Sequence, residues 1–112
     1  MTSTQSSSAL SVDPQVMRVA ADCHASTAAD YQDYRARFEL WADGVKAEIL
    51  RCHGSVAAPV AEALADHAER VGAQVATAAA HHAVMGEKLA AAAQGYERVD
   101  EAGAAAVSAV VV

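Results

Sequence analysis

The sequence Cys-His-Gly-Ser-Val-Ala-Ala-Pro, at residues 52–59, separates two long segments whose apolar residues recur at helical spacing. Within it, Gly54 can adopt the left-handed conformation that ends a helix, and Ser55 can cap the N-terminus of the next one. The preceding His53 completes this turn. A proline in the first turn of a helix does little harm, whereas one deep inside it breaks the hydrogen-bond ladder. We therefore predict a turn at about residues 53–56.

The composition favours helix strongly. Alanine supplies about a quarter of the 112 residues, and the aromatic residues are one Phe, one Trp and three Tyr. This mix is typical of helices and gives little material for a sheet. The predicted fold is all-α, a two-helix antiparallel hairpin with helices at about residues 13–52 and 57–107. Pairing about Gly54 would place residues opposite each other when their numbers sum to about 108.

Both ends of the chain are predicted to lie outside the hairpin. Residues 1–10 are rich in Ser and Thr and lack periodicity, which indicates a disordered tail. The first helix then begins sharply, with Asp13 as its N-cap and Pro14 as its first residue. Residues 108–112 are expected to form a C-terminal tail, so the hairpin domain is predicted over residues 11–107.

Four aromatic residues lie close together on the first helix: Tyr31, Tyr34, Phe38 and Trp41. Their steps of three or four positions place them on one helical face. The predicted register sets them opposite small residues of the second helix, and large side chains interdigitate well with small ones. We therefore predict that they form the packing core, and that replacing Trp41 with Ala would cost about 3–5 kcal/mol.

A lone hairpin this rich in alanine buries little large apolar surface, and two helices leave each other half uncovered. A second hairpin would complete a four-helix bundle. The sequence therefore predicts a partner, either another helical-hairpin protein or a second copy of the chain in a homodimer.

Charge and hydropathy exclude several partners. The formal net charge of −6 argues against nucleic acid, which needs a basic surface. The chain does not open with the basic and apolar segments of a cleaved signal peptide. Its Ala-rich second half is interrupted by charged and polar residues, so no membrane insertion is predicted.

The two cysteines are predicted to be unbridged within the chain. Cys23 and Cys52 both fall on the first helix, about 43 Å apart if that helix is continuous. A disulfide requires Cα atoms roughly 4.4–6.8 Å apart. Neither cysteine has zinc-site spacing, and each is expected to be a small buried side chain.

Enzyme signatures are missing from the sequence. It contains no Glu-x-x-His pair, no His-Glu-x-x-His motif and no glycine-rich phosphate loop. We therefore predict a protein that is not an enzyme and that binds no cofactor and no metal. The weakest alternative is a metal- or redox-binding bundle that uses His24, His82 and Cys23, which the metal content of the purified protein tests.

One short stretch near the end, Tyr-Glu-Arg-Val-Asp at residues 96–100, matches the Tyr-x-x-x-Asp pattern of type VII secretion signals. Val-Asp-Pro at residues 12–14 and His-Gly at residues 53–54 accompany it. Together these motifs resemble the EspC family, small proteins associated with the ESX (type VII) secretion systems of mycobacteria and related actinobacteria. The resemblance covers about residues 10–107. WXG-type relatives carry Trp-x-Gly in the turn, whereas the nearest match here is Trp-Ala-Asp-Gly at residues 41–44.

The resemblance implies a secreted substrate or co-secreted factor, made in the cytoplasm without a cleaved signal peptide and exported to the medium or the cell surface. It also implies that the secretion ATPase recognises Tyr96 and Asp100. These residues lie one helical turn apart and offer a ring for a pocket and a carboxylate for a basic rim. From the residues alone, the favoured interpretation is that Tyr96 continues the apolar stripe against Val12 and Val16, with Asp100 solvated, and the resemblance reverses this preference.

We therefore predict a type VII secretion-associated factor, with an intracellular dimerising adaptor as the alternative. The adaptor would have the same hairpin and no export. ESX-dependent export to the culture medium separates the two.

Overall fold

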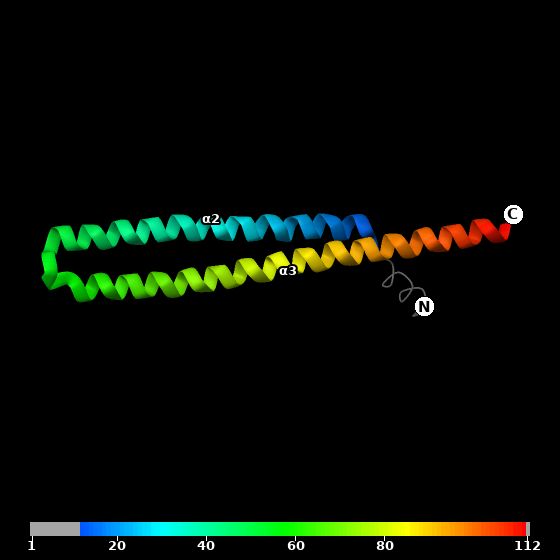
Figure 1. Cartoon of the computed structure of the whole chain (residues 1–112). Coiled ribbons are helices and arrows are strands. Elements are labelled where there is room, and N and C mark those ends of the chain that lie inside the picture. Colours follow the sequence, from blue (N-terminus) through cyan, green and yellow to red (C-terminus); the bar gives the residue numbers. More distant parts are fainter. Residues whose placement is uncertain (1–11, 112) are drawn as a thin grey trace, which may run out of the picture. The chain divides into compact units, whose positions relative to one another are not determined.

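The structure is a computed structural model that describes residues 12–111, and every regular element in this range is helical (Figure 1). Helix α2 covers Pro14–His53, the short 3-10 helix η1 covers Gly54–Ala57, and α3 covers Ala58–Val111. The prediction of an all-helical chain is confirmed. The tail predicted at residues 1–10 lies outside the described residues.

Helix α2 begins at a side-chain cap. The Asp13 carboxylate accepts a hydrogen bond from the backbone N–H of Gln15 at 2.9 Å, and the Asp13 carbonyl accepts one from the N–H of Met17 at 3.2 Å. Pro14 follows as the first residue of α2, where its missing N–H is not needed. The carboxylate therefore satisfies a donor that the start of a helix leaves without an intrahelical partner.

The turn depends on one left-handed residue. His53 ends α2, and Gly54 follows with a φ of 67°, a conformation that side chains with a Cβ rarely adopt. Ser55 lies inside η1, where its carbonyl accepts the N–H of Ala58. We predicted Ser55 as the N-cap of the second helix, and this is wrong because the 3-10 hydrogen bonding delays the start of α3 to Ala58.

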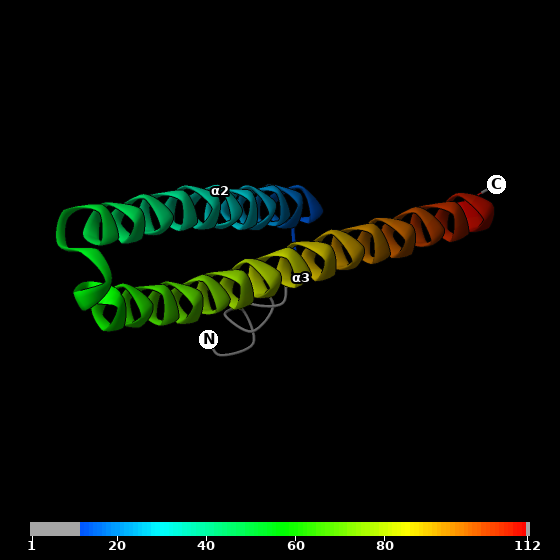
Figure 2. The same ribbon diagram turned by 60° about the vertical axis from the view of Figure 1, so that its left-hand side comes forward.

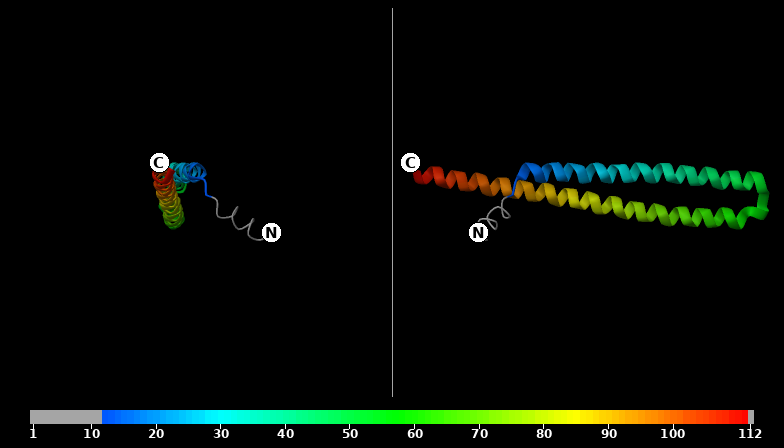
Figure 3. Two further views of the ribbon diagram at one scale, coloured as in Figure 1. Left: turned by 90° about the vertical axis from the view of Figure 1, so that its right-hand side faces the viewer. Right: turned by 180° about the vertical axis from the view of Figure 1, so that it is seen from behind.

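The chain divides into two compact units, each containing parts of both long helices. The turn unit is Ala25–Val84, and the terminal unit combines Met1–His24 with Met85–Val112. In the turn unit, α2 and α3 lie side by side and run in opposite directions (Figures 1 and 3). In the terminal unit, α3 continues past the start of α2 (Figure 2).

Three close approaches set the observed register: Tyr31 with His82, Glu39 with Gly72, and Arg18 with Glu97. Their residue numbers sum to about 111 to 115, so the predicted sum of 108 is wrong. The physical reason is the length of the turn. Because η1 takes up four residues, His53 and Ala58 are the residues at which the two long helices end and begin. Pairing about these two residues already raises the sum of opposite residue numbers by about three.

The helices meet along a stripe of small residues, which we call the Ala/Gly seam. Its members in the turn unit are Ala42, Ala61, Ala68, Gly72 and Ala79, and those in the terminal unit are Ala21, Gly86 and Ala93. No large side chain among the described residues is fully buried. On α3 the seam recurs every seven positions, with a single step of four from Ala68 to Gly72. Small residues at a helix contact allow the backbones to approach closely.

The predicted packing core is wrong. Tyr34 is 48% exposed and Trp41 is 57% exposed; Tyr31 is also exposed and Phe38 is half-buried. The face of α2 that contacts α3 is one residue away from the predicted face. Trp41 precedes the seam residue Ala42, and neighbouring helix positions point about 100° apart. Since the buried positions of both helices are occupied by small residues, the large rings lie at the edge of the contact.

Helix α3 is longer than predicted. We expected it to end near residue 107 and a tail to occupy residues 108–112, but α3 continues to Val111. The last turns are rich in alanine and contain no proline, so helix propensity is high, and Gly103 does not interrupt them. Residues 98–110 are all exposed, so this end of α3 has no covering element among the described residues.

The seam makes a prediction about side-chain size. Ala79 is 2% exposed, and a leucine there must push the helices apart, so Ala79→Leu should lower the free energy of unfolding by about 1–3 kcal/mol. The control is Ala80→Leu, one position along the helix at an exposed site, which should change it by no more than about 0.5 kcal/mol. Urea unfolding measures both, and equal effects at the two positions would contradict a contact made by small residues.

Candidate recognition surfaces

The Tyr-Glu-Arg-Val-Asp motif at residues 96–100 lies on α3 in the terminal unit. Tyr96 is 45% exposed, and Asp100 is exposed. Residues four positions apart lie above one another on a helix, so the ring and the carboxylate share one side of α3. The structure therefore presents the two predicted signal residues together on an accessible surface.

Tyr96 does not close over the start of α2. The sequence left open that Tyr96 packs against Val12 and Val16 as a continuation of the apolar stripe. In the structure Val16 is 63% exposed and Val12 is exposed as well. An enclosed apolar contact would leave little of these side chains accessible, so they do not form an enclosed apolar core at this end.

An ion pair joins α2 to a residue of the motif, Glu97. The Arg18 guanidinium donates through Nε to Glu97 Oε1 at 2.8 Å and through Nη2 to Glu97 Oε2 at 2.8 Å. This two-point geometry is the most directional that an arginine and a carboxylate can form. The hydrogen bonds raise the pKa of Arg18 and lower the pKa of Glu97. Both groups therefore stay charged through the neutral range.

Sequence reasoning missed this ion pair because the predicted register does not place Arg18 opposite Glu97. The other ion pairs recorded among the described residues are Arg35 with Glu39 and Arg51 with Glu48, both within α2. Arg18 with Glu97 differs from these two pairs because it links α2 to α3.

The turn unit carries an aromatic face, defined as Tyr31, Tyr34, Phe38 and Trp41. The rings of Tyr34 and Phe38 stack with centroids 6.0 Å apart, and those of Phe38 and Trp41 with centroids 5.8 Å apart. Tyr31 stacks on His82 of α3 at 5.6 Å. Stacked rings at such separations restrain one another. The result is an ordered apolar surface that remains largely open to solvent.

A shallow apolar hollow adjoins the aromatic face. It is lined by Thr27, Asp30, Tyr31, Tyr34 and Val75, and so draws on both helices of the turn unit. Exposed apolar surface of this kind, with a polar group at its rim, is typical of sites where another protein binds.

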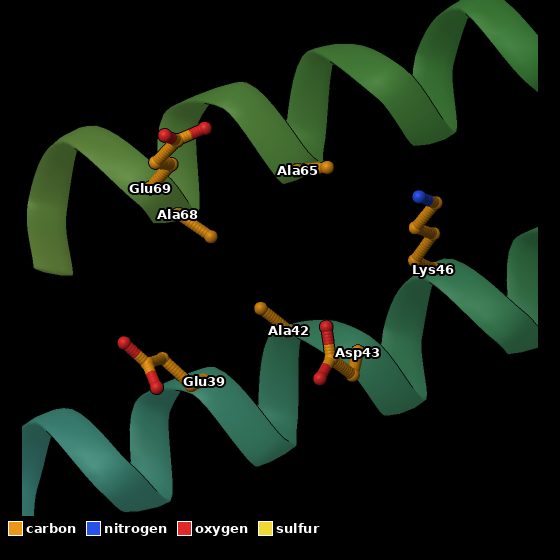
Figure 4. Close-up of a pocket in the computed structure, with 7 residues that line it drawn as sticks. All are labelled: Glu39, Ala42, Asp43, Lys46, Ala65, Ala68 and Glu69. Carbon is orange, nitrogen blue, oxygen red and sulfur yellow. The ribbon is translucent and has the colours of Figure 1, made fainter.

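A second hollow in the turn unit has the opposite character (Figure 4). Its volume is about 240 Å³, and it is lined by Glu39, Ala42, Asp43, Lys46, Ala65, Ala68 and Glu69. Seam alanines form its floor, and charged side chains surround it (Figure 4). Trp41 and Asp43 flank Ala42 and point about 100° to either side of it. The polar hollow and the aromatic face therefore lie on opposite sides of the seam.

The structure also places the candidate metal and thiol residues of the described range. Within residues 12–111, no three His, Cys, Asp or Glu side chains are grouped as metal ligands. Cys23 and Cys52 are free and exposed. Our expectation that they are buried is wrong, because neither belongs to the seam. Cys52 instead lies at the end of α2, with its Sγ 3.4 Å from Glu48 Oε1.

The two long helices define a small all-α protein, and in the described part of the chain neither helix has a stretch long and apolar enough to cross a bilayer. The family model described as "Excreted virulence factor EspC, type VII ESX diderm" matches residues 6–109. The chain therefore belongs to the EspC family, which its motifs resemble. This family consists of excreted factors associated with type VII secretion and is not a known family of enzymes. No curated protein and no solved structure matches the chain.

The exposure of Trp41 predicts a small effect on stability. In the monomer, Trp41→Ala should lower the free energy of unfolding by less than about 1 kcal/mol, because most of the indole is already in water. Phe38→Ala is the matched comparison and should cost more, since that ring is half-buried. Guanidinium unfolding at low protein concentration measures both. A decrease of about 3 kcal/mol in the free energy of unfolding for Trp41→Ala would indicate that Trp41 is buried and would contradict its exposure.

Proposed function

We propose that Tyr96 and Asp100 form the export signal of this EspC-family chain, and that the exported protein acts by binding another protein rather than by catalysis. The observation that supports the signal is the joint exposure of the two side chains on one side of α3. The partner that recognises them is the type VII secretion ATPase.

The two signal residues offer complementary chemistry to such a receptor. The Tyr96 ring supplies apolar area with few rotatable bonds, so little conformational entropy is lost when it enters a pocket. The Asp100 carboxylate can accept charge-assisted hydrogen bonds from a basic rim. Because both residues are exposed, binding requires no local unfolding of the terminal unit.

The aromatic face supplies a second surface with a different partner. We propose that α2 and α3 act as a helical hairpin that completes a four-helix bundle with a second hairpin, from another protein or from a second copy of the chain. Tryptophan and tyrosine are the residues that most often dominate binding energy at protein interfaces. Their rings are already ordered by stacking, which reduces the entropic cost of association.

The export signal makes the first functional prediction. Asp100→Ala should abolish ESX-dependent export while changing the free energy of unfolding by no more than about 0.5 kcal/mol, because the carboxylate is exposed. Tyr96→Phe tests the hydroxyl, and Tyr96→Ala tests the ring. Export is measured as the ratio of the chain in the culture medium to the chain in cells. Normal export of a folded double variant, Tyr96→Ala with Asp100→Ala, would show that these residues are not the export signal. It would favour the alternative of an intracellular adaptor.

The aromatic face makes the second functional prediction. Sedimentation at micromolar concentration should show self-association or, with a purified helical-hairpin partner, a complex, and Trp41→Ala should weaken either one about tenfold or more. Leu40→Ala is the control, because Leu40 is 73% exposed and adjacent in sequence but points to another side of α2. Equal loss in the two variants would indicate that the aromatic face is not the contact.

A further inference from the structure

The ion pair between Arg18 and Glu97 has one member inside the proposed signal, because Glu97 lies between the two recognised residues. Glu97 follows Tyr96 directly and precedes Asp100 by three positions. We propose that Arg18 is a positioning residue of the export signal, and that its ion pair with Glu97 fixes the rotation of α3 at which Tyr96 and Asp100 face a receptor. This inference rests on the proposed role of Tyr96 and Asp100 in export.

Helix geometry links the ion pair to the signal. Successive residues are about 100° apart around a helix. Measured from Glu97, Tyr96 lies about 100° and Asp100 about 60° around the axis, both in the same direction. Since Arg18 holds Glu97 against α2 through two hydrogen bonds of 2.8 Å, the directions of Tyr96 and Asp100 follow. Asp100 follows the seam residue Ala93 by seven positions, so its direction lies close to that of the seam. A turn of α3 by one residue in one sense would carry Tyr96 to the direction that Glu97 now holds.

Apolar packing at this end of the protein specifies rotation only weakly. Residues 90–93 are four consecutive alanines, so turning α3 by one position there exchanges one methyl group for another. At Gly86, the other seam residue of α3 in the terminal unit, the same turn would bring Met85 or Glu87 to the contact, so the weak specification is confined to residues 90–93. A polar contact between helices can specify register where apolar contacts do not. The bidentate pair of Arg18 and Glu97 is such a contact in the terminal unit.

The exposure of the ion pair separates positioning from stability. About two fifths of each side chain is accessible to solvent, and exposed ion pairs contribute little to stability. Loss of Arg18 should therefore leave a folded chain in which α3 samples more than one rotation. Arg51 and Glu48 form a pair of similar chemistry within α2, far along the chain from the signal, and supply a control of equal charge change.

The test measures export of the full chain in an actinobacterium with a working ESX apparatus. Arg18→Glu and Glu97→Arg should each reduce export at least about fivefold. The double reversal, Arg18→Glu with Glu97→Arg, should restore export because the pair re-forms with opposite polarity. Arg51→Glu should export normally. Circular dichroism should show each variant helical, with a melting shift of less than about 4 °C.

The outcomes distinguish this inference from the proposed signal when Asp100→Ala is included. If Asp100→Ala blocks export and Arg18→Glu does not, the positioning role is wrong and the signal stands. If Asp100→Ala exports normally, both are wrong. If each single reversal blocks export and the double reversal of a folded chain does not restore it, Arg18 or Glu97 is contacted directly by the receptor. That result would contradict the positioning role of Arg18. A loss of export in Arg51→Glu equal to that in Arg18→Glu would also contradict it.

Discussion

Close contact between alanine and glycine residues is the constraint on which the rest of this structure depends. A methyl group or a hydrogen at each buried seam position allows the two helix backbones to lie close to each other. Large residues therefore lie at the edges of the contact. Hydrophobic stabilisation grows with the apolar area that is buried, and methyl groups supply little of it. The helices gain proximity at the seam and leave their most apolar side chains accessible.

This arrangement has different consequences in the two units. In the turn unit, rings that would fill the core of a conventional helix pair form an ordered apolar surface, with charged residues on the other side of the seam. A protein partner is the natural way to cover such a surface. In the terminal unit, residues 90–93 are all alanine, so the methyl groups there do little to distinguish one rotation from the next. There a directional ion pair can determine which side chains a receptor encounters.

The sequence predicted the helical fold, the site of the turn and the family, and each rested on a strong local signal. Asp13 and Pro14 lie where a helix start requires them, and Gly54 has the left-handed φ that ends α2. The family followed from short motifs near residues 12, 53 and 96, which the family match supports. These features depend on a few adjacent residues, so a single sequence is enough to recognise them.

The features that were missed depend on contacts between distant residues. Periodicity analysis gives weight to large apolar side chains, so the stripe through Trp41 was taken as the contact and the neighbouring Ala42 was overlooked. The register was wrong because it depended on the length of η1, which no local signal fixed. With the wrong register, Arg18 and Glu97 were not placed opposite each other. The helical end beyond residue 107 is an exception, because the absence of a helix-stopping residue there was a local signal that was not used.

The most direct test of a seam made by small residues is the solvent accessibility of Trp41, the single tryptophan of the chain. Acrylamide quenching of its fluorescence can be measured in the dilute, folded monomer and in the urea-unfolded chain. An indole at the edge of the seam should be quenched nearly as efficiently in the folded chain as in the unfolded one, with emission typical of a ring in water. Strong protection from acrylamide in the monomer, with blue-shifted emission, would show that the aromatic residues and not the alanines hold the helices together.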